Sequence, residues 1–199
     1  MTSNRDALRQ WSQLHDGYDV DRSRLVRGWL LLVHRLAVPL SRWHVPPSAV
    51  TAAGVAAALA AAAVARPLSA ALVLVTAICD GLDGAVAIQR GRSSRHGGLI
   101  DHSADRVTDV LFALALWHAG AGAWIAIADV VLVLGYEAAR SLARRRDKAG
   151  ALVTVGERPI RVAVTVIGIA LAPTLGAAAV ALLGVVSLFQ LSMVMRTGW

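Results

Sequence analysis

Long apolar stretches recur along most of this chain, and they restrict its possible folds more than any other feature. We place apolar segments at residues 48–65, 68–88, 98–118, 122–142, 159–175 and 177–195. A helix needs about 20 apolar residues to cross a hydrocarbon core of roughly 30 Å, and each segment is near that length. Composition agrees, because 56% of the 199 residues are hydrophobic and 17% are charged. The sequence therefore predicts an all-α integral membrane protein with six transmembrane helices.

An amphipathic segment precedes the apolar ones. Residues 22–45 place leucines and a tryptophan at helical spacing between arginines, a pattern typical of a juxtamembrane helix at a membrane surface. Residues 1–21 are polar and mixed in charge, which is not typical of a cleaved signal peptide. We predict three parts: a polar N-terminal segment at 1–21, an interfacial helix at 22–45 and a six-helix transmembrane domain at 46–199.

The positive charge of the chain is concentrated in two loops. The formal net charge is +7, and residues 89–97 and 143–158 are strongly basic. Nucleic-acid binding is one interpretation of such a balance, but basic loops between apolar segments are typical of the cytoplasmic side of a membrane. We therefore predict contact with membrane lipids, no nucleic-acid partner, and a multi-pass protein of the cell membrane with both termini cytoplasmic.

Four aspartates flank the first basic loop. Asp80 and Asp83 are three residues apart, and Asp101 and Asp105 are four apart, so each pair shares one face of its helix. The short loop between the pairs makes the two helices antiparallel neighbours. We expect the four carboxylates to converge near the cytoplasmic surface of the membrane.

Carboxylates at membrane depth are unfavourable, and carboxylates that repel one another are more so. Bound metal would compensate them, and oxygen ligands favour Mg²⁺, Mn²⁺ or Ca²⁺ over Zn²⁺. An alternative is that each aspartate pairs with an arginine such as Arg90, Arg92 or Arg106, which is plausible for one acid and weak for all four. A divalent-cation transporter is a further alternative, disfavoured because the acids gather at one end of the helices rather than along a pathway.

The segment DGLDGAVAIQRGRSSRHGGLIDHSAD resembles the signature of the CDP-alcohol phosphatidyltransferases, D-x2-D-G-x2-A-R-x8-G-x3-D-x3-D. Seven of its eight fixed positions agree, at Asp80, Asp83, Gly84, Ala87, Gly97, Asp101 and Asp105. The segments PPSAVT at 46–51 and GERPIRV at 156–162 resemble further parts of the family's sequence. The likeness extends over residues 40–195.

This resemblance implies a membrane phosphotransferase of phospholipid biosynthesis. Such an enzyme transfers a phosphatidyl or other substituted phosphate group from a CDP-alcohol, such as CDP-diacylglycerol, to the hydroxyl of an acceptor alcohol and releases CMP. The resemblance implies two Mg²⁺ or Mn²⁺ ions held by Asp80, Asp83, Asp101 and Asp105, with Asp105 also acting as the general base. The positions implied to hold the CDP moiety are Ser48, Ala49, Val50, Thr51, Gly84, Ala87, Ser94 and Gly97. The resemblance also implies a homodimer and a cytoplasmic active site.

One position departs from the signature. Ile88 stands where the pattern has an arginine, which in the family is understood to help hold the CDP-linked substrate. Arg90 or Arg92 could substitute from the loop. The departure motivates an alternative hypothesis, a weakened or inactive homologue that binds CDP-lipid.

Three arginines are candidates for binding the acceptor. Arg140, Arg158 and Arg161 could form a pocket for a phosphorylated polyol such as glycerol phosphate or inositol phosphate, although positive-inside topology explains them equally well. Ala138 stands where inositol-phosphate enzymes of the family tend to carry lysine. Two further acids lie in apolar segments: Asp109 continues the Asp101–Asp105 face and could orient an arginine, whereas Asp129 has no partner evident from the sequence.

Overall fold

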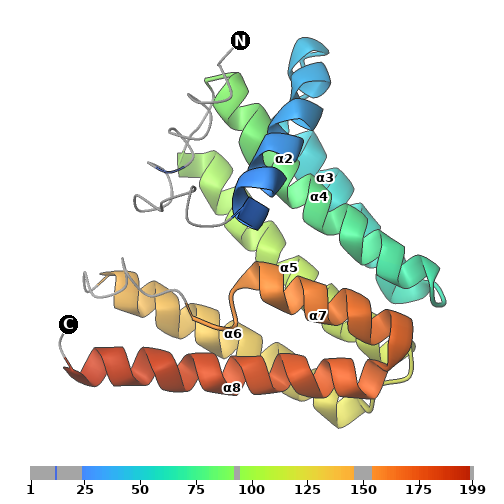
Figure 1. Cartoon of the computed structure of the whole chain (residues 1–199), viewed down its shortest axis with the longest axis vertical. Coiled ribbons are helices and arrows are strands. Elements are labelled where there is room, and N and C mark those ends of the chain that lie inside the picture. The colour runs from blue at the N-terminus through green and yellow to red at the C-terminus, as the bar shows by residue number, and fades with distance from the viewer. Residues whose placement is uncertain (1–11, 13–23, 92–94, 146–153, 198–199) are drawn as a thin grey trace. The chain divides into compact units, whose positions relative to one another are not determined.

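A computed structural model of the protein describes Ser12 and residues 24–91, 95–145 and 154–197. Within these ranges the chain is helical, with turns between helices and no strand. The helices labelled in Figure 1 are α2 (Arg24–Arg42), α3 (Pro47–Ala63), α4 (Leu68–Gln89), α5 (Arg95–His118), α6 (Ala123–Arg145), α7 (Arg158–Leu171) and α8 (Pro173–Thr197). The predicted all-α class is confirmed, and α3 to α8 correspond to the six apolar segments.

The turn between α7 and α8 lies earlier in the chain than predicted. We predicted apolar segments at 159–175 and 177–195, but α7 ends at Leu171 and α8 begins at Pro173. Proline is favoured in the first turn of a helix, because it has no N–H to satisfy there and its φ is already helical. Gly176 therefore lies inside α8, where its lack of a side chain serves packing.

Not every helix is long and apolar enough to cross a membrane alone. By length and composition α4 and α8 qualify within the described ranges, and α2 with α3, bent by 118° between them, would add a third span if the pair crossed together. The 17 residues of α3 and the 14 of α7 extend only about 26 Å and 21 Å at a rise of about 1.5 Å per residue. The predicted number of six spans is therefore not confirmed.

The chain forms two compact units, and the first comprises residues 1–56 and 76–105. Here α2 packs closely on α4, since a Cβ on Gly81 would lie 3.2 Å from Val33 Cγ2. The amide of Gln89 at the end of α4 donates to the backbone oxygen of His34, at 2.9 Å. These contacts hold α2 against the helix that carries Asp80 and Asp83.

The bend between α2 and α3 is fixed by an arginine. Arg90 NH1 donates to the carbonyl oxygens of His44 and Val45, at 3.1 and 2.9 Å. Because α2 ends at Arg42, these two carbonyls lie in the turn outside the helix, where the Arg90 guanidinium supplies a hydrogen-bond donor. The helix predicted at 22–45 is thus observed at Arg24–Arg42, whereas its location at a membrane surface stays a prediction.

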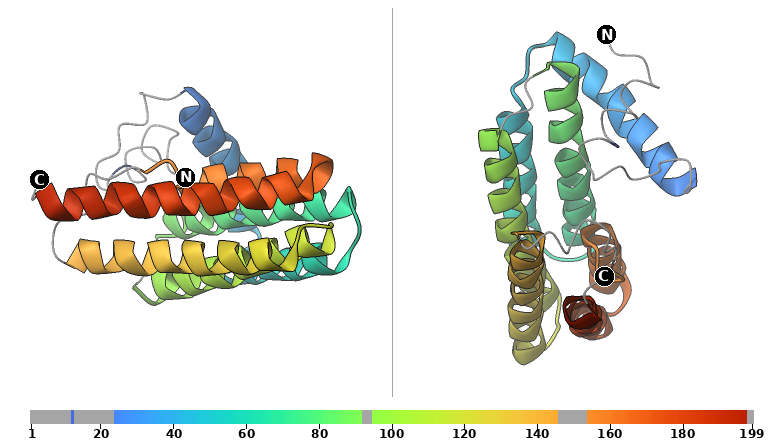
Figure 2. Two further views of the ribbon diagram at one scale, coloured as in Figure 1. Left: turned by 90° about the horizontal axis from the view of Figure 1, so that it is seen from below. Right: turned by 90° about the vertical axis from the view of Figure 1, so that its left-hand side faces the viewer.

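The second unit comprises residues 57–75 and 106–199. In it α8 packs against both α6 and α7, and the two views of Figure 2 show α6 and α8 side by side along their lengths. Gly168 of α7 and Gly176 of α8 meet so closely that a Cβ on either would clash with the Cα of the other. Small residues permit such close packing of helices in membranes, where the hydrophobic effect does not drive them together.

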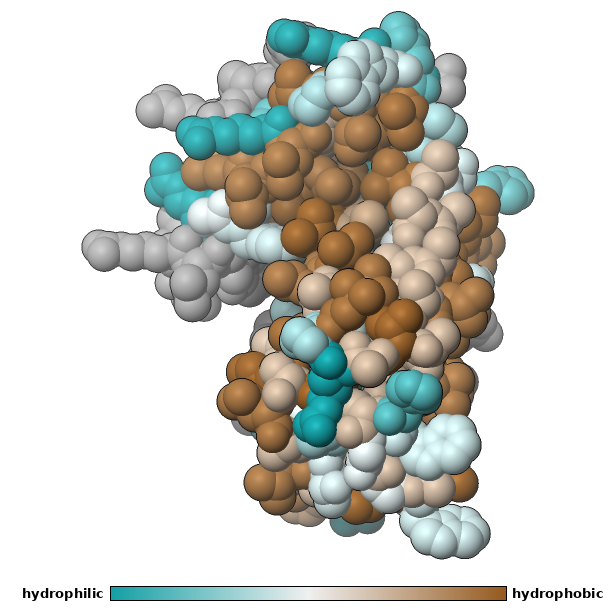
Figure 3. Space-filling view, turned by 90° about the vertical axis from the view of Figure 1, so that its right-hand side faces the viewer, coloured by the Kyte–Doolittle hydropathy of each residue, from teal (hydrophilic) through white to brown (hydrophobic). Residues whose placement is uncertain are grey.

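Much of the outer surface is apolar. On α8 alone Leu182, Val185, Phe189 and Met193 are each at least half exposed. Brown, apolar side chains dominate the face drawn in Figure 3, with few hydrophilic residues among them. Apolar exposure on this scale is unfavourable in water and suits a protein surrounded by lipid.

Candidate functional site

Three of the four signature aspartates converge in the first unit. Asp80 on α4 and Asp101 and Asp105 on α5 each offer a carboxylate oxygen, and these oxygens all lie within 4.8 Å of one another. The side chains are half-buried, so a ligand can reach them. We call these three residues the aspartate group. Three carboxylates at such distances can hold a divalent cation through hard oxygen ligands.

Asp83 lies on the same helix but outside the aspartate group. Its side chain is buried and accepts a hydrogen bond from Thr51 Oγ1 on α3, at 2.5 Å. The Thr51 hydroxyl also lies 3.2 Å from the backbone oxygen of Pro47, but its single proton favours the shorter, charge-assisted bond to Asp83. A role for Asp83 as a metal ligand stays a prediction.

The helix faces beside the aspartates are sparsely covered. Gly84 lies one turn after Asp80 on α4, and a Cβ there would meet no atom within 4 Å. Gly97, one turn before Asp101 on α5, is exposed, and Ala87 is half-buried. A ligand can therefore approach the backbone of α4 next to Asp80.

The other positions implied to hold the CDP moiety begin α3. Ser48 and Ala49 are exposed there, whereas Val50 is buried. Thr51 faces Asp83, as described above. Ser94 lies outside the described residues, so its predicted role has no structural account.

Neither candidate replacement for the missing signature arginine gains support. Ile88 is half-buried on α4 and brings no charge. The NH1 group of Arg90 is engaged by the carbonyls of His44 and Val45 at the α2–α3 bend. Arg92 lies outside the described residues.

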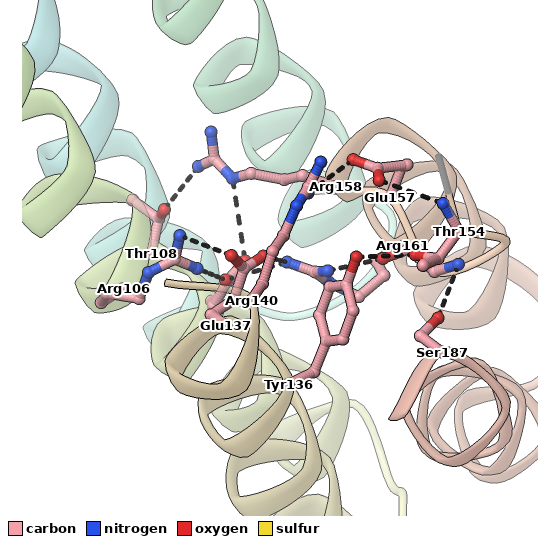
Figure 4. A network of polar contacts seen from close by, with 12 residues as sticks. Arg106, Thr108, Tyr136, Glu137, Arg140, Thr154, Glu157, Arg158, Arg161 and Ser187 are labelled. Carbon is pink, nitrogen blue, oxygen red and sulfur yellow. Dashed lines mark hydrogen bonds and ion pairs between the residues drawn. The ribbon is translucent and has the colours of Figure 1, made fainter. Parts of the chain in front are cut away.

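The three candidate acceptor arginines do come together in the second unit. Figure 4 shows them within one network of polar contacts, joined by an additional arginine and by acids. We use the name arginine network for Arg106, Arg140, Arg158 and Arg161 with Asp109, Glu137 and Glu157.

Arg161 lies at the centre of the arginine network. Its NH2 group is 3.2 Å from both Asp109 Oδ2 and Glu137 Oε1, and NH1 donates to the backbone oxygen of Gly156 at 2.6 Å. Arg106 contacts the same two acids, at 3.0 and 3.2 Å. Asp109 thus orients arginines, as we predicted, and only 4% of the Arg161 side chain is exposed.

Arg140 and Arg158 lie toward the outside of the arginine network. Arg140 NH1 is 2.9 Å from Glu157 Oε2, and Arg158 NH2 donates to Thr108 Oγ1 at 2.8 Å. Their side chains are 20% and 15% exposed, so an anion could reach them more easily than Arg161. The ring of Tyr136 lies 6.0 Å from the guanidinium groups of both Arg140 and Arg161.

The turn before α7 is tied to α6 and α8. The Thr154 hydroxyl shares a hydrogen bond of 2.6 Å with Tyr136 Oη, and the Gly156 N–H donates to Ser187 Oγ at 2.9 Å. A Cβ on Gly156 would overlap Ser187 Oγ, so only glycine fits there. This turn leads directly into Arg158 and Arg161 and sets where they lie.

Several residues of this region were not among the predicted site residues. They are Thr108, Tyr136, Glu137, Thr154, Glu157 and Ser187. One sequence feature could have identified two of them: Glu137 and Glu157 are acids at the edges of apolar segments, each within three or four residues of a candidate arginine. Which arginine each acid meets depends on helix packing and could not be read from spacing.

Comparisons with known proteins agree with the geometry. The family model for the CDP-alcohol phosphatidyltransferases matches residues 31–193. A phosphatidylinositol phosphate synthase of Cutibacterium acnes is 32% identical over 155 residues, which cover 71% of this chain and 74% of that protein. The corresponding synthase of Mycobacterium marinum is 30% identical over 144 residues, 67% of this chain and 62% of that protein.

Solved structures show the same fold. A crystal structure of Mycobacterium tuberculosis phosphatidylinositol phosphate synthase with CDP-DAG bound is similar at a TM-score of 0.60 and 28% identity, over 84% of this chain and 93% of that one. A second structure of that synthase, in complex with manganese and citrate, gives a TM-score of 0.70 at 24% identity, over 83% and 89% of the two chains. With its signature aspartates on two adjoining helices and a family match over most of its length, the chain belongs to the CDP-alcohol phosphatidyltransferases, membrane phosphotransferases of phospholipid biosynthesis.

Proposed function

We propose that this protein transfers the phosphatidyl group of CDP-diacylglycerol to the hydroxyl of a phosphorylated polyol and releases CMP. The observation that carries the proposal is the convergence of Asp80, Asp101 and Asp105 within the family signature. It provides a place for divalent metal beside an open face of α4 at Gly84.

In this mechanism Asp80, Asp83, Asp101 and Asp105 would hold two Mg²⁺ or Mn²⁺ ions. When bound, metal at these residues would supply positive charge to neutralise a pyrophosphate and to stabilise the departing CMP oxygen. Asp105 is also the general base that takes the proton of the acceptor hydroxyl. Thr51 holds the Asp83 carboxylate in place through its 2.5 Å hydrogen bond.

The donor is assigned by similarity to a solved relative. The M. tuberculosis synthase with CDP-DAG bound is 28% identical to this chain over 84% of its length. We assign the CDP moiety to the surroundings of the aspartate group. The residues assigned to it are Ser48, Ala49, Val50, Thr51, Gly84, Ala87, Ser94 and Gly97.

The acceptor is assigned to the arginine network. Relatives at 30–36% identity are phosphatidylinositol phosphate synthases, which favours inositol phosphate over glycerol phosphate. Arg140, Arg158 and Arg161 would bind the phosphate of the acceptor, because guanidinium groups match its oxygens in pairs. Ala138, where lysine is expected in inositol-phosphate enzymes, weighs against this choice and makes a panel of acceptors necessary.

We further propose the membrane arrangement. All six helices from α3 to α8 cross the bilayer in residues 46–199, preceded by the polar segment 1–21 and an interfacial helix at 22–45. Both termini and the active site face the cytoplasm, because two proposed spans separate the basic segments 89–97 and 143–158, which would place both on the side where basic loops are usually found. The protein acts as a homodimer, which crosslinking of the detergent-purified protein would test.

An assay of CMP release tests the function. Purified protein receives Mg²⁺ or Mn²⁺, CDP-diacylglycerol, and in turn inositol phosphate, glycerol phosphate or unphosphorylated inositol. We expect release above that of an Asp105→Asn control with a phosphorylated acceptor and little with inositol. If no acceptor raises CMP above this control, the protein does not catalyse the proposed transfer.

A weakened, donor-binding homologue is a second candidate, favoured by Ile88 and by the engagement of Arg90 at the α2–α3 bend. Under this hypothesis Ile88→Arg would raise the rate of CMP release and lower the CDP-diacylglycerol concentration needed. Ile88→Leu is the matched control, because it keeps size without adding charge. A wild-type rate equal to that of Ile88→Arg would reject this candidate.

A further inference from the structure

A buried carboxylate in α6 has no place in the proposed reaction. Asp129 is 2% exposed, and neither of its carboxylate oxygens has a hydrogen-bond partner among the described residues. A carboxylate buried without a partner is strongly unfavourable, and acids inside membrane segments usually serve a function. The environment of Asp129 therefore indicates a partner other than a protein group.

A small cavity lies next to Asp129. Its volume is about 20 Å³. It is lined by Asp109, Phe112, Ala113, Leu116, Asp129, Val133, Arg161, Thr165 and Val180. A cavity needs roughly 10–15 Å³ of this volume for one water molecule, which also requires two to four polar partners. Asp109, Asp129, Arg161 and Thr165 carry the polar side chains among the lining residues, and the volume admits a single water.

The cavity joins Asp129 to the centre of the arginine network. The Arg161 guanidinium is held by Gly156, Asp109 and Glu137, and Figure 4 shows Arg161 beside Glu137 within this network. The network contains four arginines and three carboxylates, and Asp129 is the fourth acid beside it. A bound sodium ion is disfavoured, because the Arg161 guanidinium would repel it.

We propose that Asp129 is a positioning residue for the arginine network, acting on Arg161 through one water molecule in this cavity. The water accepts a hydrogen bond from the guanidinium and donates one to the Asp129 carboxylate. Asp129 thereby balances the charge of Arg161 and holds its guanidinium in place from the membrane side. This role rests on the proposed function, in which Arg161 contributes to binding the acceptor phosphate.

The test measures binding of an anion separately from turnover. Thermal unfolding of the detergent-purified protein is followed as inorganic phosphate is added, without CDP-diacylglycerol, for wild type, Asp129→Asn and Asp129→Leu. Asp129→Asn keeps the size and removes the charge, whereas Asp129→Leu also fills the cavity. Ser192→Ala, on an exposed part of α8, is the control.

We expect both Asp129 variants to weaken phosphate binding about tenfold, the scale of losing one charge-assisted hydrogen bond, with stabilisation by Mn²⁺ unchanged. In the CMP assay the same variants should raise the KM for the acceptor and leave the KM for CDP-diacylglycerol within about twofold. A crystal structure should show the water in wild type and not in Asp129→Leu.

Two results would overturn the proposal. One is a variant whose melting temperature changes while phosphate affinity does not, because Asp129 would then be only structural. The other is a wild-type protein that binds no phosphate. Failure of the proposed function is separate, since it appears as absent CMP release even where phosphate binds and Asp129 affects it.

Discussion

The aspartate group of the first unit and the arginine network of the second unit both collect charged side chains on apolar helices, but they balance those charges differently. Asp80, Asp101 and Asp105 bring like charges within 4.8 Å of one another on half-buried side chains. In the arginine network, by contrast, Asp109 and Glu137 each contact at least two guanidinium groups. Like charges favour a cation taken from solution, whereas opposite charges compensate one another within the fold.

Because of this difference, mutations in the aspartate group should reduce activity, whereas mutations in the arginine network should reduce stability. Neutralising an acid of the aspartate group removes repulsion as well as function, so the fold should tolerate it. Neutralising an acid of the arginine network removes one of the counter-ions that its buried arginines share, so the free energy of unfolding should fall. The predictions below test this separation.

The largest effect is expected for Asp105→Asn. CMP release should fall by about 10²- to 10⁴-fold, the contribution of a general base, while the melting temperature stays near that of wild type. Ser103→Ala on the same helix is the control, because the exposed Ser103 hydroxyl donates to the Leu99 carbonyl of its own helix. A fall in stability that parallels the loss of activity would remove the contrast between the two regions.

Asp109→Asn should have the opposite profile. Asp109 contacts Arg106, Arg158 and Arg161, and removing one partner of a buried ion pair costs about 3–5 kcal/mol of folding free energy. Thermal unfolding in detergent measures this loss. Added Mn²⁺ should still stabilise the variant, because the aspartate group is intact. An unchanged melting temperature would show that the arginine network contributes little to stability.

Gly156→Ala should disturb the arginine network through its backbone. A Cβ there would overlap Ser187 Oγ and lie 3.0 Å from the Leu183 carbonyl oxygen, and such overpacking costs about 1–3 kcal/mol. The control is Gly135→Ala on α6, where a Cβ meets no atom within 4 Å. Equal melting temperatures for the two variants would contradict the close packing of this turn.

The smallest effect is expected for Thr51→Val, which keeps shape and removes the hydrogen bond to Asp83. Loss of a group that holds a metal ligand weakens metal affinity by about tenfold at the low end. The Mn²⁺ concentration that gives half-maximal CMP release should rise accordingly, with little change in stability. If that concentration is unchanged, the Thr51 hydroxyl does not position Asp83 for metal binding.

The helices and the aspartate group were largely predictable. Apolar segments long enough to form helices correspond to α3–α8, and most of their ends differ from our prediction by only a few residues. The turn at Pro173 was misplaced because apolar residues continue through it; Pro173 begins α8, and Gly168 and Gly176 meet closely across the turn. An apolar segment does not by itself establish a transmembrane span, since α7 has 14 residues and does not qualify as a span alone.

The sequence by itself determined the family through its signature and the helical class through its apolar segments. It also placed Asp101 near Asp105, because residues four apart lie on one face of a helix. Only the tertiary structure decided that Thr51 bonds to Asp83, 32 residues away, and that Arg161 meets Glu137, 24 residues away. It also decided that Asp129 lies beside Arg161 at a cavity. Such pairings depend on how each helix is rotated and packed against its neighbours. The spacing of charged residues along the chain does not determine that rotation.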